Sequence, residues 1–462
     1  MTPRLYFCVI GGLLAASVSS LTAAPPSPFG RPLIPDMVPD ASVVDIDGVF
    51  YCYATTDGWG RHLDTSGTPV VWKSRDFVNW SFEGSIFPSN FNAKYWAPSA
   101  PVKHDGRYYL FPTLDGKITA TVSDSLTGPF HTLDGKDIFP GSGWSPFPID
   151  QKSCIDAEVF RDDDGQYYMF YSRRRMVKLK PDLSGPDGPV VTLDTGETAY
   201  SEGPAIFKRK GIYYYLYTLG GGENYAYAYM MSSTSIMGPW VQPTEKIIAK
   251  TDPSVGIYGP GHGSFLNPTG TDDWYFIHLE YGRGSTNRQS YAQKMTFNAD
   301  GTINPIKLTN QGVGAIRQVP QRRANLALAG TATASSVRPN FNVRLATPQA
   351  PERTETFTPD LATDDSYGSR WMAAGGDTAP WWQIDLGEAR DIVGTEAYFV
   401  KPAAGHAYKL ESSLDGKTWS PYGGHDDVIL RSPHVDKKTA RVRYLRLTIL
   451  KGEPGLWEFR VY

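Results

Sequence analysis

The 462-residue sequence is poor in cysteine, carries little net charge and has no long apolar run beyond its N-terminus. Three cysteines exclude a scaffold held by many disulfides, and Cys8 lies within the N-terminal apolar stretch. Cys52 and Cys154 could form one disulfide, but Cys52 alternates within an aromatic strand, which favours two buried free thiols. A formal net charge of −3 gives no electrostatic basis for nucleic-acid binding. The lack of later apolar runs excludes a membrane span in the body of the chain.

The N-terminal stretch MTPRLYFCVIGGLLAASVSSLTAAPPSP has the pattern of a secretory signal. Arg4 precedes an apolar run from Leu5 to about Val18, and small residues follow it up to Ala24. The run is short for a membrane anchor and contains glycine and serine. We therefore expect cleavage near Ala24 and a secreted mature protein, either periplasmic or extracellular.

Aromatic and turn-forming residues are abundant instead, with 27 Tyr, 12 Trp, 46 Gly and 36 Pro, and one hairpin pattern occurs five times. The copies read DIDGVFYCYATT from Asp45, KHDGRYYLFPT from Lys103, IDAEVFRDDDGQYYMFYS from Ile155, KRKGIYYYLYT from Lys208 and DDWYFIHLE from Asp272. Each copy is followed by a second pair of short strands. Four strands in each of five units of roughly 45–60 residues predict an all-β fold, a five-bladed β-propeller. A β-sandwich with coincidental turns is the alternative.

The strand before each hairpin turn is the innermost of its blade and lines the propeller axis. These strands begin about 10–12 residues before each aromatic pair, and equivalent positions in a propeller share one depth around the axis. The five residues found there are Asp40, Trp96, Asp156, Glu202 and His262. We therefore expect these side chains to converge in space.

Two carboxylates flanking a cavity are what glycoside hydrolysis requires, one to protonate the leaving oxygen and one to activate water or attack the sugar. A third carboxylate raises the pKa of the acid, because neighbouring negative charges resist ionisation. A tryptophan at the same rim can stack on a sugar face. Taken singly, Asp40 or Glu202 is more simply a turn or strand-end residue. A functional site is favoured because these residues occupy equivalent positions in their blades.

Five segments in this order resemble glycoside hydrolase family 43 from about Pro32 to Ile316. They read DASVVDIDGVFYCYAT, YWAPS, IDAEVFRDDDGQYYMFY, SEGPAIFKRKGIYYYLYT and GPGHGSF. The resemblance implies a five-bladed propeller and single-step hydrolysis with inversion. By it, Asp40 is the general base, Glu202 the general acid and Asp156 the residue that orients the acid and tunes its pKa.

One motif departs from the family pattern, because the usual Asp-Pro-Ser around the base reads Asp40-Ala41-Ser42 here. The carboxylate is kept and only a backbone constraint is lost. Asp36, four residues earlier, is the alternative base.

The resemblance also implies a cation and an arginine that contacts the substrate. His262 is similar to the family histidine that holds a hydrated calcium ion on the axis, with water supplying most ligands because hard cations prefer oxygen. A structural histidine in a glycine-rich loop is the alternative. Arg288 resembles the family arginine that reaches the sugar or the tuning carboxylate, with Arg283 as the alternative, and Trp96 is the expected sugar-stacking residue. No organic cofactor is expected.

The C-terminal part shows alternating strand patterns such as WWQIDLGEARDIVGTEAYF and ARVRYLRLTIL, which resemble the discoidin-like jelly roll that includes family 32 carbohydrate-binding modules. In that family an early loop and a distant glutamate hold a structural calcium ion. The matching residues here are Asp364, Ser366, Ser369 and Glu458. The module could bind sugar or instead act as a buttress for the propeller.

The predicted organisation is a signal peptide at residues 1–24, a catalytic propeller at 25–316, a linker at 317–324 and a β-sandwich module at 325–462. The leading functional hypothesis is an inverting, exo-acting α-L-arabinofuranosidase on plant-type polysaccharides, because FVNWSFEG and GRGSTNRQ look closest to such members. β-D-Xylosidase, β-D-galactofuranosidase and exo-β-1,3-galactanase are alternatives within the family. A non-catalytic carbohydrate-binding protein and a scaffold for protein partners are alternatives of other classes, and the intact carboxylate trio argues against both.

Overall fold

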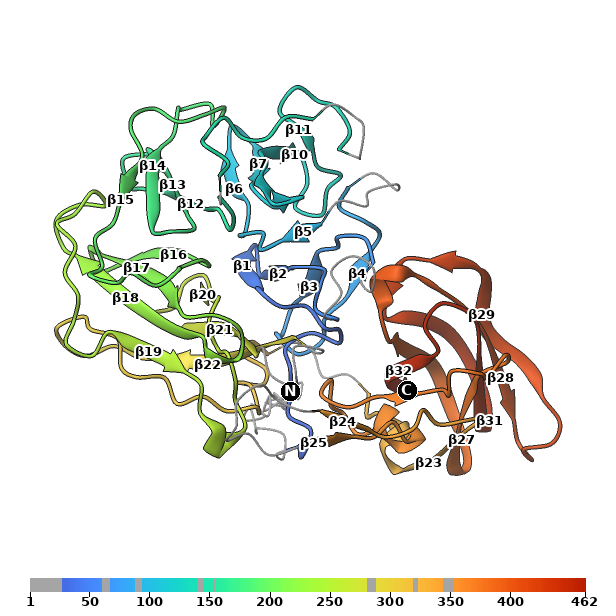
Figure 1. Ribbon diagram of the computed structural model, residues 1–462. Helices are drawn as coiled ribbons and strands as arrows, with labels where there is room; N and C mark the ends of the chain where they lie inside the picture. The colour runs from blue at the N-terminus through green and yellow to red at the C-terminus, as the bar shows by residue number, and fades with distance from the viewer. Residues whose placement is uncertain are drawn as a thin grey trace, which may run out of the picture.

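The computed structural model describes residues 27–59, 67–87, 94–138, 144–152, 154–280, 288–318, 323–343 and 353–462. In these ranges the regular elements are β-strands and short 3-10 turns, which form a propeller and, beside it, a C-terminal β-sandwich (Figure 1). The predicted signal peptide lies outside the described residues, as does Arg283. No helix in the described part of the chain is long and apolar enough to cross a membrane.

Five antiparallel sheets form the blades, which confirms the five-bladed propeller. Blade 1 contains β1 (Ser42–Ile46), β2 (Val49–Tyr53) and β3 (Trp72–Ser74), and blade 2 contains β6 (Val102–His104), β7 (Arg107–Leu110), β10 (Thr121–Ser123) and β11 (His131–Thr132). Blade 3 contains β12 (Glu158–Arg161), β13 (Tyr167–Tyr171), β14 (Arg175–Lys178) and β15 (Val191–Thr192). Blade 4 contains β16 (Ala205–Arg209), β17 (Ile212–Leu219), β18 (Ala226–Ser232) and β19 (Ile247–Lys250). Blade 5 contains β20 (Ser264–Leu266), β21 (Trp274–Glu280) and β22 (Gln289–Met295).

The first strands of the blades surround the axis, since β1 contacts β20, β20 contacts β16, β16 contacts β12 and β12 contacts β6. The described part of the propeller also contains smaller elements outside the five blade sheets. They are β4 (Phe82–Glu83), a separate sheet of β5 (Tyr95–Trp96), β8 (Thr113–Leu114) and β9 (Lys117–Ile118), and the 3-10 turns η2 (Gly222–Asn224) and η3 (Pro253–Val255).

The abundant aromatic residues pack mainly between blades. Phe207 of blade 4 packs in a tilted arrangement against Trp274 of blade 5 with ring centroids 4.6 Å apart, and Phe170 of blade 3 stacks on Tyr215 of blade 4 at 5.5 Å. Tyr215 and Tyr217 are fully buried. Flat rings suit the seam between two twisted sheets, and their burial supplies much of the apolar stabilisation. Most of the aromatic content therefore serves the fold and not a sugar surface. Cys52 and Cys154 are buried free thiols, as expected.

A residue with left-handed backbone precedes the inner strand of every blade. These residues are Asp40 (φ 55°), Ala97 (φ 38°), Asp156 (φ 61°), Gly203 (φ 52°) and His262 (φ 48°). The predicted register is therefore wrong by one residue in two blades, where Trp96 and Glu202 each come one position before the left-handed residue. Turn length is not the cause, since Arg209 pairs with Ile212 in blade 4 across a turn as short as the one between Ile46 and Val49 in blade 1. The left-handed residue lies 10 residues before the aromatic pair in blade 4 and 12 residues before it in blade 5, so a count of 10–12 residues cannot fix the register to one position.

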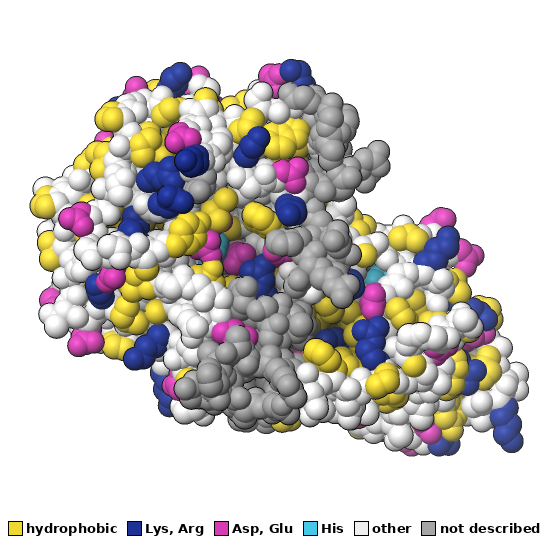
Figure 2. Space-filling model, viewed as in Figure 1, with side chains coloured by type: hydrophobic (Ala, Val, Ile, Leu, Met, Phe, Trp, Pro, Cys, Tyr) yellow, Lys and Arg dark blue, Asp and Glu magenta, His cyan; other side chains and the backbone are white. Residues whose placement is uncertain are grey.

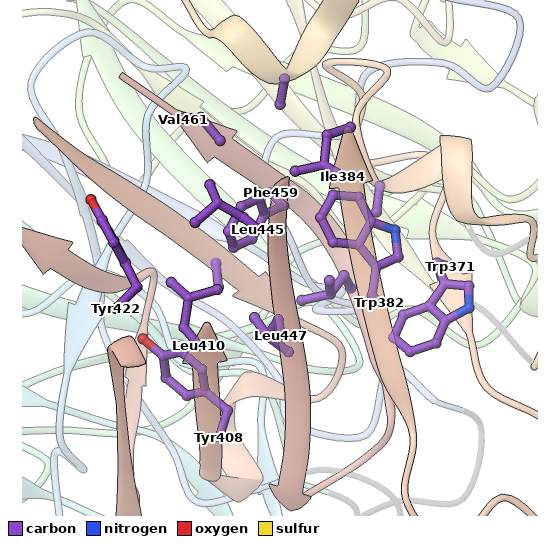
Figure 3. Close-up of a cluster of buried hydrophobic side chains, with 14 of the residues drawn as sticks. Trp371, Trp382, Ile384, Tyr408, Leu410, Tyr422, Leu445, Leu447, Phe459 and Val461 are labelled. Atoms are coloured by element: carbon purple, nitrogen blue, oxygen red, sulfur yellow. The ribbon is translucent and has the colours of Figure 1, made fainter. Parts of the chain in front are cut away.

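The C-terminal β-sandwich confirms the predicted jelly roll. Its main sheet has the order β26-β32-β27-β31-β28-β29, with β23 also paired to β27. Its elements are β23 (Thr331–Ala334), β24 (Phe341–Val343), β25 (Arg353–Glu355), β26 (Trp371–Met372), β27 (Trp381–Phe399), β28 (His406–Ser413), β29 (Ser420–Ile429), β30 (Arg431–Ser432), β31 (His434–Lys451) and β32 (Gly455–Val461), with 3-10 turns η4 (Leu326–Ala329), η5 (Pro359–Ala362) and η6 (Pro402–Ala404). Alternate residues such as Trp382, Ile384, Leu445 and Leu447 point into one buried core, as the period-2 pattern predicts (Figure 3).

The two domains are in contact through backbone and side chains. β4 of the propeller pairs with β30 of the sandwich, and the amide of Thr68 donates to the carbonyl of Ala403 at 3.0 Å. Trp59 of blade 1 lies against the indole of Trp457 and the guanidinium of Arg370, at 6.2 Å and 5.6 Å. The sandwich is therefore a buttress for the blade 1 loop that leads toward the propeller axis.

Candidate active site

Three of the sequence-predicted side chains meet at the propeller axis. Nδ1 of His262 lies 3.5 Å from Oδ1 of Asp40 and 3.7 Å from Oδ2 of Asp156. Acidic, basic and histidine side chains gather at this place near the centre of the propeller face (Figure 2). The left-handed residues before the inner strands turn these side chains toward the axis, so the convergence expected for Asp40, Asp156 and His262 is present.

Asp40 is buried and held by neighbours from blades 1 and 5. Thr55 donates its hydroxyl hydrogen to Oδ2 of Asp40 at 2.6 Å, and Nη1 of Arg288 lies 3.9 Å from the same oxygen. Nη2 of Arg288 also pairs with Asp57. Arg288 thus bridges two carboxylates, one of which the sequence analysis did not identify. Burial lowers the pKa of Arg288, and the charge of Asp40 opposes that shift.

Asp156 is only 5% exposed and forms the link between blades 3 and 4. Its Oδ2 accepts a hydrogen bond from the amide of Gly203 at 3.1 Å, and its own amide donates to Oγ1 of Thr113 at 2.9 Å. Burial, and then the charge of Asp40, raise the pKa of Asp156 to about 8, while the Gly203 amide opposes this.

Glu202 precedes Gly203, and its carboxyl is close enough to Asp156, His262 and Asp40 for their charges to act on it. Tyr225, from the glycine-rich turn between β17 and β18, donates its hydroxyl hydrogen to Oε1 of Glu202. Burial, and then the charge of Asp156, raise the pKa of Glu202 to about 8. A carboxyl with such a pKa stays protonated at neutral pH and can donate a proton.

The other expected residues fall in different places. Trp96 is half-buried on β5, with Nζ of Lys94 5.5 Å from its ring, and the next amide, of Ala97, donates to Thr55 at 2.7 Å. Trp96 therefore lies near the site. Asp36 instead faces the domain interface, where its Oδ1 accepts from the indole of Trp59 at 3.1 Å and burial raises its pKa to about 7.

Residues missed by sequence reasoning include Asp57, Tyr225 and Glu158. Glu158 begins β12, and burial raises its pKa to about 7 despite the hydroxyl of Ser99 and the charge of His262. Asp57 and Tyr225 lie in long turns whose conformation no hairpin motif predicts. Their one sequence signal is a polar or aromatic residue beside glycine, in TTDG and GGGENYAY.

The two expected calcium sites, one at the propeller axis and one in the sandwich, differ in the ligands that the protein supplies. Among the residues that the structure describes, no group of three or more His, Cys, Asp or Glu side chains is arranged to hold a metal ion. A cation beside His262 therefore needs water for most of its ligands, and the nearby carboxylates of Asp40 and Asp156 make the place favourable for positive charge.

The C-terminal set shows a clearer feature of a cation site. Glu458 is fully buried, and within the described chain neither carboxylate oxygen has a hydrogen-bond partner of normal geometry. Burial raises its pKa well above the usual value, and the charges of Asp364 and Asp365 add to this while the guanidinium of Arg460 opposes it. Asp364 accepts from the amide of Ser366 at 3.1 Å and from the hydroxyl of Ser369 at 2.6 Å. These residues fit a hard cation, which would compensate the buried charge.

Fold and site together define a β-propeller enzyme with buried, paired carboxylates of the kind that hydrolyses glycosidic bonds. Residues 29–303 match the model described as glycosyl hydrolases family 43, so the chain belongs to that family, and it is a glycosidase with a carbohydrate substrate. Residues 331–459 match the F5/8 type C domain, the discoidin-like sandwich. Both expected family resemblances are confirmed.

Several known proteins are similar to this chain. It is 27% identical over 325 residues to beta-D-galactofuranosidase xynD of Aspergillus niger, covering 65% of this chain and 90% of that protein. It is 26% identical over 370 residues to arabinoxylan arabinofuranohydrolase of Bacillus subtilis, covering 68% and 71%. Against xylosidase/arabinosidase 43B of Humicola insolens it is 28% identical over 289 residues, covering 55% of this chain and only 49% of that relative. A solved structure described as a glycoside hydrolase has 49% identity and a TM-score of 0.90, covering 94% of this chain and 99% of that one.

Proposed function

We propose that this chain is a secreted, inverting exo-glycosidase that removes terminal α-L-arabinofuranose from plant-type polysaccharides. The observation that carries the mechanism is the link Asp40–His262–Asp156–Gly203, which leads from one carboxylate to the backbone beside another. Glu202, protonated at neutral pH, donates a proton to the leaving oxygen. Asp40 accepts a proton from the attacking water, while burial and then the charge of Asp156 keep the pKa of Glu202 high.

A second candidate is β-D-galactofuranosidase. The Aspergillus niger relative with that name aligns over 90% of its length. α-L-Arabinofuranose and β-D-galactofuranose share the configuration of the furanose ring and differ in the exocyclic carbon chain, so one pocket can accept either ring. β-D-Xylosidase and exo-β-1,3-galactanase activities are further alternatives within the family.

The proposal includes two calcium sites. His262 would hold a hydrated cation at the axis, where it adds positive charge beside the carboxylates. Asp364, Ser366, Ser369 and Glu458 would hold a structural cation in the sandwich, which supports the domain interface through Ser366, whose hydroxyl donates to Gly30 at 2.6 Å. Residues 1–24 would direct secretion.

The test is hydrolysis of an aryl-glycoside panel by the wild type and by Glu202→Gln. The panel contains α-L-arabinofuranoside, β-D-galactofuranoside, β-D-xylopyranoside and β-D-galactopyranoside. We expect release from the arabinofuranoside, reduced by about 10²–10⁴-fold in the variant when the leaving group needs protonation. Proton NMR of the first-formed sugar should show the inverted anomer. No release from any member, by wild-type protein that is folded and calcium-loaded, would reject the enzymatic proposal in favour of a binding protein.

A further inference from the structure

The turn that follows β13 reaches the site from blade 3. The amide of Ser172 donates to the carbonyl of Ile155 at 3.0 Å, next to Asp156. The amide of Arg173 donates to the carbonyl of Ser201 at 2.7 Å, next to Glu202. The backbone of Arg173 is therefore anchored beside the segments that carry two of the proposed catalytic carboxyls.

This turn has an unusual backbone for its sequence. Arg173 and Arg174 both have left-handed conformations, with φ 63° and φ 57°. Such positions normally carry glycine or asparagine, because a side chain there meets steric strain. Strain of this kind persists where the surrounding structure holds it, commonly at functional sites.

The two arginines have different surroundings. The guanidinium of Arg174 donates to the carbonyls of Ala199 and Glu197, each at 2.9 Å, and so braces the segment that leads to Tyr200. Arg173 is exposed, and its guanidinium lies 6.0 Å from the ring centroid of Tyr200, at the outer limit of a cation–π contact. Tyr200 is itself 45% exposed. The turn thus presents a cation and an aromatic face together.

Within the described part of the propeller, Arg173 forms no ion pair. Cations on the outer edges of the blades differ in this respect, since Arg209 pairs with Asp272 at 2.7 Å and Arg107 with Asp124 at 2.8 Å. Lys94 repeats the pattern of Arg173, because it is exposed and lies over Trp96. Two cations without a described carboxylate partner therefore lie over aromatic rings near an acidic centre.

We propose that Arg173 and Tyr200 form a subsite for a sugar that carries a carboxylate, so that the preferred substrate is an acidic, uronate-bearing polysaccharide. This rests on the proposed function, in which Glu202 protonates the leaving oxygen and the residues beside Glu202 surround the leaving group. The sugar ring packs on the exposed face of Tyr200, and its carboxylate pairs with the guanidinium in a charge-assisted hydrogen bond. Lys94 and Trp96 provide a second pair of a cation and an aromatic ring for the same kind of contact with an acidic sugar.

The experiment uses one oligosaccharide in two forms. In the first form the terminal sugar identified by the aryl-glycoside panel is attached beside a glucuronic acid, and in the second the uronate is reduced to a primary alcohol. kcat/KM is measured for the wild type, Arg173→Gln and Arg161→Gln. Arg161 is the matched control, because its guanidinium lies 5.8 Å from the ring of Tyr167, which begins β13 at the end opposite to the turn that carries Arg173.

We expect the wild type to favour the acidic form by about threefold to tenfold, mainly through KM, and about 0.5 M NaCl to reduce this preference. Arg173→Gln should lose the preference while it keeps the wild-type rate on the reduced form and on the aryl glycoside. Arg161→Gln should behave as wild type.

Equal kcat/KM on both forms, or an equal loss on both in Arg173→Gln, would overturn the subsite while leaving the glycosidase intact. If no aryl glycoside is cleaved, the proposed function fails separately. Both forms are then made with terminal α-L-arabinofuranose and titrated calorimetrically into Glu202→Gln, which decides the subsite alone. The subsite requires tighter binding of the acidic form and loss of that difference when Arg173→Gln is added.

Discussion

The amide of Gly203 donates a hydrogen bond to Oδ2 of Asp156, which ties the residue after the proposed acid to the carboxylate that tunes it. Gly203 has φ +52°, and a Cβ there would come within 2.7 Å of the imidazole of His262. Glycine is therefore required both for the backbone conformation and for the close approach of His262.

Gly203→Ala should lower kcat by at least tenfold and destabilise the fold by about 2 kcal/mol, because it combines backbone strain with a displaced His262. The control is Gly211→Ala in the outer turn of the same blade, where φ is +82° but no atom lies within 4 Å of the added Cβ. Chemical denaturation and kinetics on the aryl glycoside measure both effects. Equal activity in the two variants would show that contact with His262 is unimportant.

The pKa of Glu202 predicts the basic limb of the pH profile. An acid donates its proton only while it is protonated, so kcat/KM should fall as the pH rises through about 8. Burial is the largest cause of this raised pKa and the negative charge of Asp156 is the second, so Asp156→Asn should move the limb to lower pH without returning it to the usual value of a glutamate. The measurement is kcat/KM against pH on a glycoside with a poor leaving group. A limb at the same pH in both proteins contradicts the assigned coupling.

The domain interface should influence the site through Trp59. The carbonyl of the preceding residue, Gly58, accepts the backbone amide of Arg288 at 2.8 Å, so movement of Trp59 displaces Arg288. Trp59→Ala should cost about 3 kcal/mol of unfolding free energy and lower kcat several-fold. Trp419→Ala is the control, since Trp419 also packs on an arginine, Arg446, at 4.1 Å, but within the sandwich. If Trp59→Ala loses stability and keeps full kcat, the interface is structural only.

Calcium should stabilise the sandwich through Glu458. A ligand that binds only the folded state raises Tm with concentration, so chelation should lower Tm by a few degrees and added calcium should restore it. Glu458→Gln removes the buried charge, so its Tm should no longer depend on calcium. Differential scanning calorimetry measures both. A wild-type Tm that is the same with chelator and with calcium would reject the site.

Much of the fold and part of the site could be predicted from local pattern. Five hairpins in order predict five blades, and the carboxylates before the inner strands predict Asp40 and Asp156 because each precedes its strand by a short, regular distance. The register of Glu202 and Trp96 was wrong by one residue, since the distance from the left-handed residue to the aromatic pair varies between blades from 10 to 12 residues. Asp57 and Tyr225 lie in irregular turns, where the spacing of residues in the sequence does not tell in which direction a side chain points.

The sequence by itself determined the blade count, the sandwich and the kinds of side chain at the axis, because strand alternation and turn residues are local properties. The tertiary structure alone decided which carboxylates are buried together, and hence the raised pKa values of Asp156 and Glu202. It also decided that Asp36 faces the second domain and that Arg173 stands over Tyr200. These facts depend on contacts between blades and domains that are far apart in the chain. Desolvation and Coulomb energy depend on distances in space, which the sequence does not give directly.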